Sequence, residues 1–110
     1  MIDIPEAIEF LNCIGYKAQK SDRPGTITVR CKSGLVQDVQ VPHIEPFVIR
    51  ALSRSEHILD KLGEFLYPDT LPEIRNARLI LKFDSAEQSI EHALRLGLTP
   101  AHLATTEDPA

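Results

Sequence analysis

The chain has 110 residues, with 12 Lys and Arg against 16 Asp and Glu, and a formal net charge of −4. This length fits a single domain, and the 43% of hydrophobic residues predict a folded core. An acidic sum disfavours a main role in sustained contact with a nucleic-acid backbone, because such contact needs cationic surface. No apolar run approaches the roughly 20 residues that a membrane-spanning helix needs, so we expect no membrane role.

The first predicted element is a helix that begins after Asp3. Asp3 and Glu6 have the spacing of a capping box, in which each side chain accepts a hydrogen bond from the other residue's backbone N–H. Apolar residues then recur at steps of three and four and give the helix one buried face. Gly15 is placed to end this helix in a left-handed conformation.

A three-stranded antiparallel meander is predicted next. Tyr16 to Gln19 form its first strand, and a turn cluster over 21–25 follows. Thr26 to Lys32 alternate between apolar and polar residues, as a sheet with one solvent-exposed face requires. After Ser33-Gly34, a third strand places residues 35, 37, 39 and 41 on a common face, and Pro42 ends it.

The segment from His43 to Leu66 is predicted to form one long amphipathic helix. Apolar or small residues alternate at steps of four and three from Ile44 to Phe65, and the phase continues through Ser53-Arg54-Ser55. Ile49 falls on the polar side of this helix. The spacing is also that of a heptad seam, which predicts a possible homodimer through the 44–66 helix.

The remaining chain predicts two more helices and an ambiguous segment. Thr70 and Glu73 suggest a capping box and a short helix to about Asn76. Residues 77–83 then fit a fourth strand, although a helical continuation also fits period 3.6. Ser85 and Gln88 cap a last helix that stops at Gly97. The expected fold is therefore α+β, with one domain over residues 1–103 and a frayed tail over 104–110.

Two groups of cations are the candidate partner-binding residues. Residues 16–32 carry five cations and one acid, Asp22, inside a chain whose sum is acidic; the five are Lys17, Lys20, Arg23, Arg30 and Lys32. On the predicted long helix a basic ridge falls on one side, opposite an acidic row of Glu56, Asp60 and Glu64; the ridge consists of Arg50, Arg54, His57 and Lys61. Both groups could bind an acidic protein surface. The cations of the helix are equally explained as solvated side chains that flank its apolar stripe, and those of the hairpin as lysines that protect a sheet edge from aggregation.

Catalytic and metal-binding signals are weak. His43 and Glu45 could form an acid/base pair only if the fold brought a third group to them, so we expect no enzyme. The four His and two Cys residues lack the close spacing of a zinc site, and we expect no cofactor. Cys13 and Cys31 fit free thiols in a cytoplasmic protein.

The sequence thus predicts a small non-catalytic protein–protein interaction module, which acts as a binder, inhibitor or adaptor. A nucleic-acid-associated regulator that uses the basic hairpin is an alternative, disfavoured because Tyr16 is the one aromatic residue among these cations. The element order is loosely similar to that of small acidic secretion chaperones of bacteria, which adds a chaperone-like homodimer as a second alternative.

Overall fold

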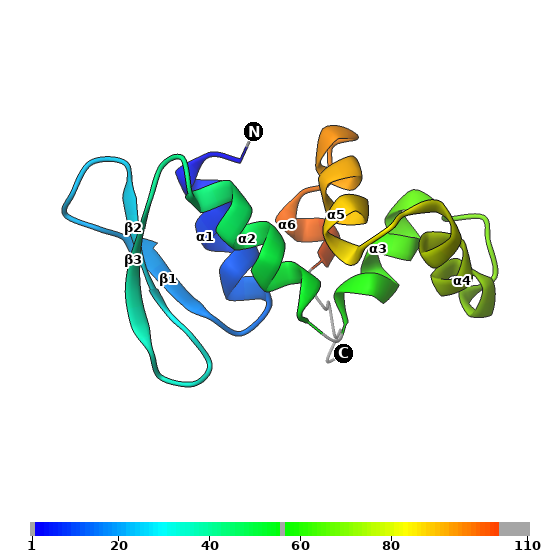
Figure 1. The fold of residues 1–110 in the computed structure, drawn as a ribbon, viewed down its shortest axis with the longest axis horizontal. Helices are drawn as coiled ribbons and strands as arrows, with labels where there is room; N and C mark the ends of the chain where they lie inside the picture. Colours follow the sequence, from blue (N-terminus) through cyan, green and yellow to red (C-terminus); the bar gives the residue numbers. More distant parts are fainter. Residues whose placement is uncertain (1, 56, 104–110) are drawn as a thin grey trace.

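The computed structural model describes residues 2–55 and 57–103, and within them six helices accompany a three-stranded sheet (Figure 1). The predicted α+β class is confirmed. The tail predicted over 104–110 lies outside the described residues.

The start and the end of the first helix follow from local signals. Helix α1 (Ile4–Cys13) begins with a complete capping box, in which Asp3 Oδ1 accepts from Glu6 N at 2.9 Å and Glu6 Oε1 accepts from Asp3 N at 3.4 Å. Gly15 follows with φ of +93°, in the left-handed region that glycine tolerates best. Both predicted boundaries are confirmed.

The sheet consists of β1 (Lys17–Lys20), β2 (Thr26–Arg30) and β3 (Val36–Gln40), which pair antiparallel in the order β1-β2-β3. The predicted meander is therefore confirmed. One face of the sheet buries Ile27, Val29 and Val39 in the core. Figure 1 shows α1 and α2 along this side of the sheet.

The predicted single helix over residues 44–66 is wrong, because the structure divides it into α2 (Ile44–Ser53) and α3 (Ile58–Leu66). At the break, Ser53 Oγ donates to the carbonyl of Arg50 at 2.7 Å, and Ser55 N donates to the carbonyl of Leu52. Serine side chains that bond the backbone compete with helical hydrogen bonds, and i−3 bonds tighten the last turn.

The two helices share α5 as a neighbour but otherwise bury their apolar sides against different elements. Helix α2 packs on α1, β3 and α5, whereas α3 packs on α4, α5 and α6. Ile49 was predicted on the polar side, yet it is buried. The apolar positions of the expected heptad seam are thus largely used inside this chain, so the homodimer expected through a continuous 44–66 helix loses that basis.

Residues 77–83 do not form a fourth strand. Helix α4 (Pro72–Lys82) includes most of this segment, so the helical alternative is correct and the predicted end at Asn76 is wrong. Its N-cap is Leu71, whose side chain has no atom that can accept a hydrogen bond, so no side chain caps the helix and the predicted Thr70–Glu73 box does not form. Leu79 is its buried residue, while Leu81 is 87% exposed.

Two further helices close the core. Ser85 Oγ accepts from Gln88 N at 3.2 Å at the start of α5 (Ala86–Arg95), and Gly97 follows its end with φ of +103°. The short α6 (Pro100–Leu103) packs against both α1 and α3. The Phe65 and His102 rings lie 4.6 Å apart, and Cys13 Sγ lies 3.6 Å from the Pro100 carbonyl oxygen.

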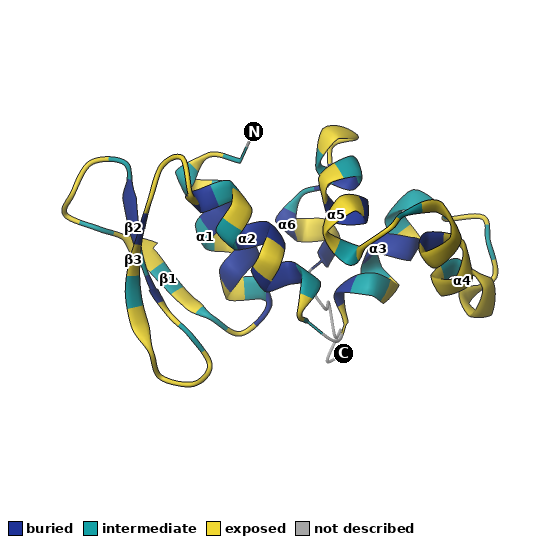
Figure 2. Cartoon of the chain, viewed as in Figure 1, coloured by how far each residue is buried: buried dark blue, intermediate teal, exposed yellow. Residues whose placement is uncertain are grey.

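The molecule is elongated, with extents of 45 × 36 × 24 Å. The sheet forms one end and α4 forms the other, and buried residues concentrate on the helices between them (Figures 1 and 2). Among the described residues, no helix has the length and apolar character needed to cross a membrane.

Candidate functional site

The outer face of the sheet, which points away from α1 and α2, carries the strongest concentration of predicted site residues. In the β1–β2 register Lys17 lies directly opposite Arg30. Alternation along the strands places both side chains on the outer face, which we define by Lys17, Gln19, Thr28, Arg30, Val36, Asp38 and Gln40. Lys17 and Arg30 are both exposed.

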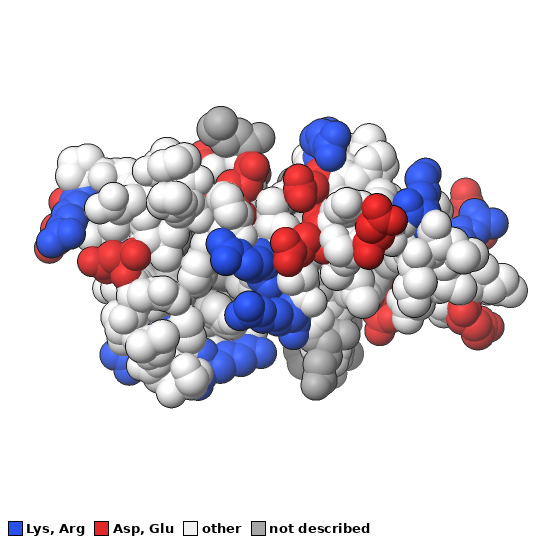
Figure 3. All heavy atoms as spheres, in the orientation of Figure 1, with Lys and Arg blue, Asp and Glu red and all other residues white. Residues whose placement is uncertain are grey.

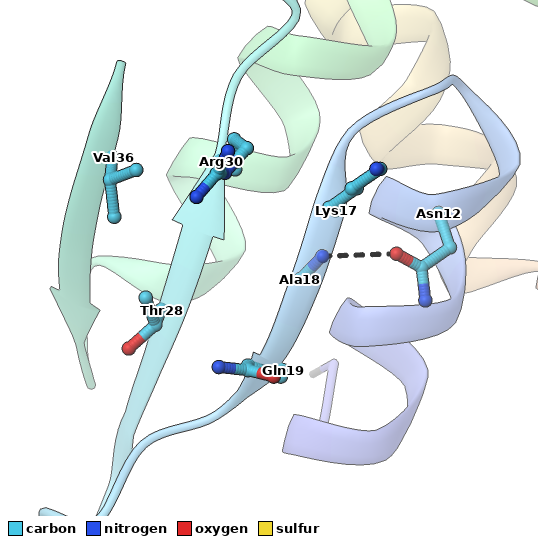
Figure 4. A pocket seen from close by; sticks show the side chains of 7 residues that line it. All are labelled: Asn12, Lys17, Ala18, Gln19, Thr28, Arg30 and Val36. Atoms are coloured by element: carbon cyan, nitrogen blue, oxygen red, sulfur yellow. Dashed lines mark hydrogen bonds between the residues drawn. The ribbon is translucent and has the colours of Figure 1, made fainter. Parts of the chain in front are cut away.

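A shallow hollow of about 340 Å³ lies at these two cations. Figure 4 shows its lining, to which α1 contributes Asn12 and β3 contributes Val36. Asn12 is held in place because its Oδ1 accepts from Ala18 N at 3.0 Å, which also satisfies the backbone at the outer edge of β1. The hollow therefore combines two cations, amide groups and one apolar side chain on a regular sheet.

Among the described residues, no carboxylate neutralises the positive charges of Lys17 and Arg30. Asp38 is the diagonal neighbour of Arg30, but its Oδ1 accepts from Thr28 Oγ1 at 2.9 Å. Across residues 2–55 and 57–103, the structure shows no ion pair at Lys17 or Arg30. Like charges directly opposite in an antiparallel pair are destabilising, so the Lys17–Arg30 pair is expected to lower the stability of the sheet.

The other three cations of the hairpin lie elsewhere. Lys20 is at the end of β1 on the opposite side of the strand from Lys17, and Arg23 lies in the exposed β1–β2 turn. Lys32 extends over Gly15, where its Cε would lie 2.9 Å from an added Cβ. Lys32 thus sits at the C-terminal end of α1, where a cation is favourable. The structure brings two of the five hairpin residues together.

The predicted basic ridge is not formed, because its residues belong to two helices and the connection between them. Arg50 is on α2, Arg54 is the residue that caps it, and His57 precedes α3. Lys61 Nζ lies 3.6 Å from Glu64 Oε2, so a member of the ridge contacts a member of the predicted acidic row. Glu56 of that row lies outside the described residues. In Figure 3, cations gather over α2 and acids lie beside them over α5.

His43 and Glu45 are not brought to a common site. His43 lies with Phe47 and Arg50 along a hollow beside β3. Glu45 lines a different hollow with Ile49 and Glu91, and its Oε2 accepts from Ile2 N at 2.8 Å. The described part of the chain also contains no group of three or more His, Cys, Asp or Glu that could hold a metal ion.

Two exposed apolar surfaces were missed by sequence reasoning. One is α4 with the residue before it, where Leu71, Ile74, Ile80 and Leu81 are exposed. The other accompanies β3, where Leu35, Val36 and Val41 are 50–61% exposed. The second surface could have been predicted from the sequence, because residues 36–40 contain neither the Lys nor the Pro that commonly protects an edge strand.

Comparison with known proteins finds no family model that matches the chain, and neither a curated protein nor a solved structure matches it.

Proposed function

We propose that this chain is a non-catalytic protein-binding module that docks an acidic surface of another protein on the outer face of its sheet. The observation that supports this proposal is the cross-strand pair of Lys17 and Arg30. The pair raises the free energy of the folded state, and an acidic partner would convert the same repulsion into attraction.

The composition of the outer face favours a protein over a nucleic acid. Val36 lines the hollow beside the two cations, and the exposed Leu35 and Val41 flank the same strand. Interfaces between proteins combine apolar contact with polar groups in this way. None of the seven residues that define the outer face is aromatic, so a single-stranded nucleic acid would find no ring on which its bases could stack.

A cytoplasmic location is part of the proposal. Cys13 and Cys31 are both free thiols, which fits a reducing compartment.

The test uses two double variants with the same change in net charge. Lys17→Glu with Arg30→Glu reverses the hollow, whereas Lys20→Glu with Arg23→Glu reverses cations outside it. A partner captured from the native host with the wild-type chain is purified, and its affinity for all three proteins is measured by calorimetry. We expect the first variant to weaken binding at least tenfold and the control to weaken it less than threefold.

Equal losses in the two variants would contradict the proposed site. Labelled single-stranded and duplex 20-nucleotide probes are measured in parallel at low salt. Binding to these probes that the first variant abolishes and the control retains would instead assign the hollow to nucleic acid.

A further inference from the structure

The open edge of the sheet at β3 has backbone groups that find no partner among residues 2–55 and 57–103. Val41 N donates to Gly25 O at 2.9 Å and Cys31 N donates to Leu35 O at 2.8 Å, which fixes the phase of the β2–β3 ladder at both ends. Because hydrogen-bonded positions alternate in antiparallel pairs, Gln37 and Val39 bond to β2. The intervening residues Val36, Asp38 and Gln40 therefore direct their N–H and C=O groups away from β2.

One of these groups is already used within the chain. The carbonyl of Gln40 accepts from His43 N at 2.6 Å. For the N–H groups of Val36, Asp38 and Gln40 and the carbonyls of Val36 and Asp38, no acceptor or donor is found among the described residues. These five groups form one row that could pair with an additional strand.

The opposite edge of the same sheet is protected. Asn12 covers β1 by accepting from Ala18 N, and two of the four β1 residues are lysines. Edge strands in native proteins are commonly protected by such covering and by lysine. β3 has neither device, since its one charged residue is Asp38, which bonds Thr28. The contrast between the edges indicates that β3 is kept available for pairing.

Beside the open edge lies a hollow of about 370 Å³ between β3 and α2, which we call the α2 groove. It is lined by residues 37–40 of β3, by Phe47 and Arg50 of α2, and by His43, the N-cap of α2. These three are spaced at i, i+4 and i+7, so they form one stripe along the helix. Phe47 is half-buried, while His43 and Arg50 are exposed and form no ion pair within the described chain.

We propose that an extended, acidic segment of a partner protein adds to β3 as a fourth strand of the sheet. Its backbone pairs with Val36, Asp38 and Gln40, as in other strand-addition complexes. On the side of the α2 groove, the methylene groups of its glutamates pack on Phe47 and a carboxylate meets Arg50. Because side chains alternate along a strand, its apolar side chains then lie on the outer face beside Val36. This inference rests on the proposed protein-binding function and specifies how the partner is held.

Charge favours this occupant over a second copy of the chain. A second copy would bring β3 itself, whose one carboxylate belongs to Asp38. In the two-fold pairing centred on Asp38, the two Asp38 side chains would lie directly opposite and repel. A partner segment with alternating carboxylates avoids this repulsion and supplies an anion for Arg50, which has no ion pair among the described residues.

The test uses the isotope-labelled full chain and a set of seven-residue blocked peptides, in which Glu alternates with Val, Ile, Leu or Phe. Backbone amide exchange is measured by NMR with and without peptide. We expect at least one peptide to slow exchange at Val36, Asp38 and Gln40 more than tenfold, with little change at Gln37 and Val39, which already bond to β2. The same peptides with Lys in place of Glu should bind at least tenfold more weakly.

Two variants complete the test. Asp38→Pro removes an outward N–H without removing a β2–β3 bond and should abolish binding. Arg50→Glu should weaken binding at least tenfold, whereas Arg54→Glu, one turn further along and outside the groove, should weaken it less than threefold. The Arg50 comparison decides the matter if the proline variant does not fold.

Three outcomes would overturn the inference. The edge amides could remain unprotected by every peptide, or both arginine variants could bind equally well. Alternatively, the edge amides could become protected in the free chain as its concentration rises, which would assign the edge to a second copy. The Lys17 and Arg30 reversal is measured separately, so the outer-face proposal can stand when the strand-addition inference fails.

Discussion

Reversing one charge of the cross-strand pair should stabilise the chain. Lys17→Glu converts a repulsive pair with Arg30 into an attractive one. Directly opposite residues on neighbouring strands have Cβ atoms about 5 Å apart, and two charges at an assumed separation of about 6.5 Å in water interact by about 0.6 kcal/mol by Coulomb's law. Screening at physiological ionic strength, where the Debye length is about 8 Å, reduces this to roughly 0.3 kcal/mol.

The reversal changes the sign of the interaction, so the expected gain in the free energy of unfolding is about 0.5 kcal/mol, within the range measured for cross-strand pairs. For a chain of this size, such a gain raises Tm by about 2–3 °C. Urea denaturation followed by circular dichroism measures the gain at low and high salt. Arg30→Glu should give a similar gain, and the double reversal should return to the wild-type value, because it restores a like-charge pair.

The double-mutant cycle separates the pair interaction from other effects of each substitution. A zero coupling energy, or a coupling that high salt leaves unchanged, would refute the view that Lys17 and Arg30 repel each other. The Lys17–Arg30 pair would then no longer indicate an acidic partner.

Three further predictions concern Asn12, Arg75 and Cys13. Asn12→Ala should lower the free energy of unfolding by about 0.5–1 kcal/mol, because Ala18 N loses its acceptor. Gln19→Ala, an exposed control next to Ala18 on β1, should change the free energy of unfolding in urea by less than half as much. Arg75→Ala should speed amide exchange in α4 roughly tenfold and leave the sheet unchanged, because Arg75 donates to two carbonyls just beyond α3; uniform acceleration throughout the chain would contradict this. Burial raises the pKa of the Cys13 thiol, so less thiolate is present at neutral pH and its alkylation by iodoacetamide should be slow, increasing as the pH rises above the ordinary thiol value; a rate at neutral pH equal to that of an unfolded thiol would argue against it.

Local signals explain why the first part of the chain was predictable. The capping box at Asp3 and Glu6 and the glycine at position 15 act within one turn of the helix, so sequence spacing alone identifies them. The alternation over residues 27–30 likewise reports which face of the strand is buried. Thr26 is an exception, because it lies on the face predicted to be solvent-exposed and is buried, with its hydroxyl donating to the Pro24 carbonyl at 3.3 Å.

The errors arose where tertiary contacts decide between patterns that fit equally well. The apolar phase of residues 44–66 continues across the break, whereas α2 packs on α1 and β3 and α3 packs on α4 and α6, with α5 in contact with both. In residues 77–83 a short apolar run fits both periods, and Leu79 alone is buried when the run is helical. A regular apolar periodicity therefore did not show whether a segment forms one continuous helix.

The candidate site was predicted in part for a related reason. Composition identified the cations of the hairpin, but the turn length and register decide which of them face each other. The predicted basic ridge was wrong because the single long helix that would carry it is divided into α2 and α3. The open edge of β3 depends on which strand is last in the sheet, and that follows from the topology rather than from any single residue.

The position of α6 has a consequence for how the chain folds during synthesis. Leu103 and Pro100 are buried against α1 and α3, and Cys13 meets Pro100 across 87 positions of sequence. The strands and α1 can pair as soon as they leave the ribosome, since their contacts are local. The core between α1 and α3 stays unsealed until α6 emerges, so the nascent chain exposes this apolar surface until Leu103 has left the ribosome.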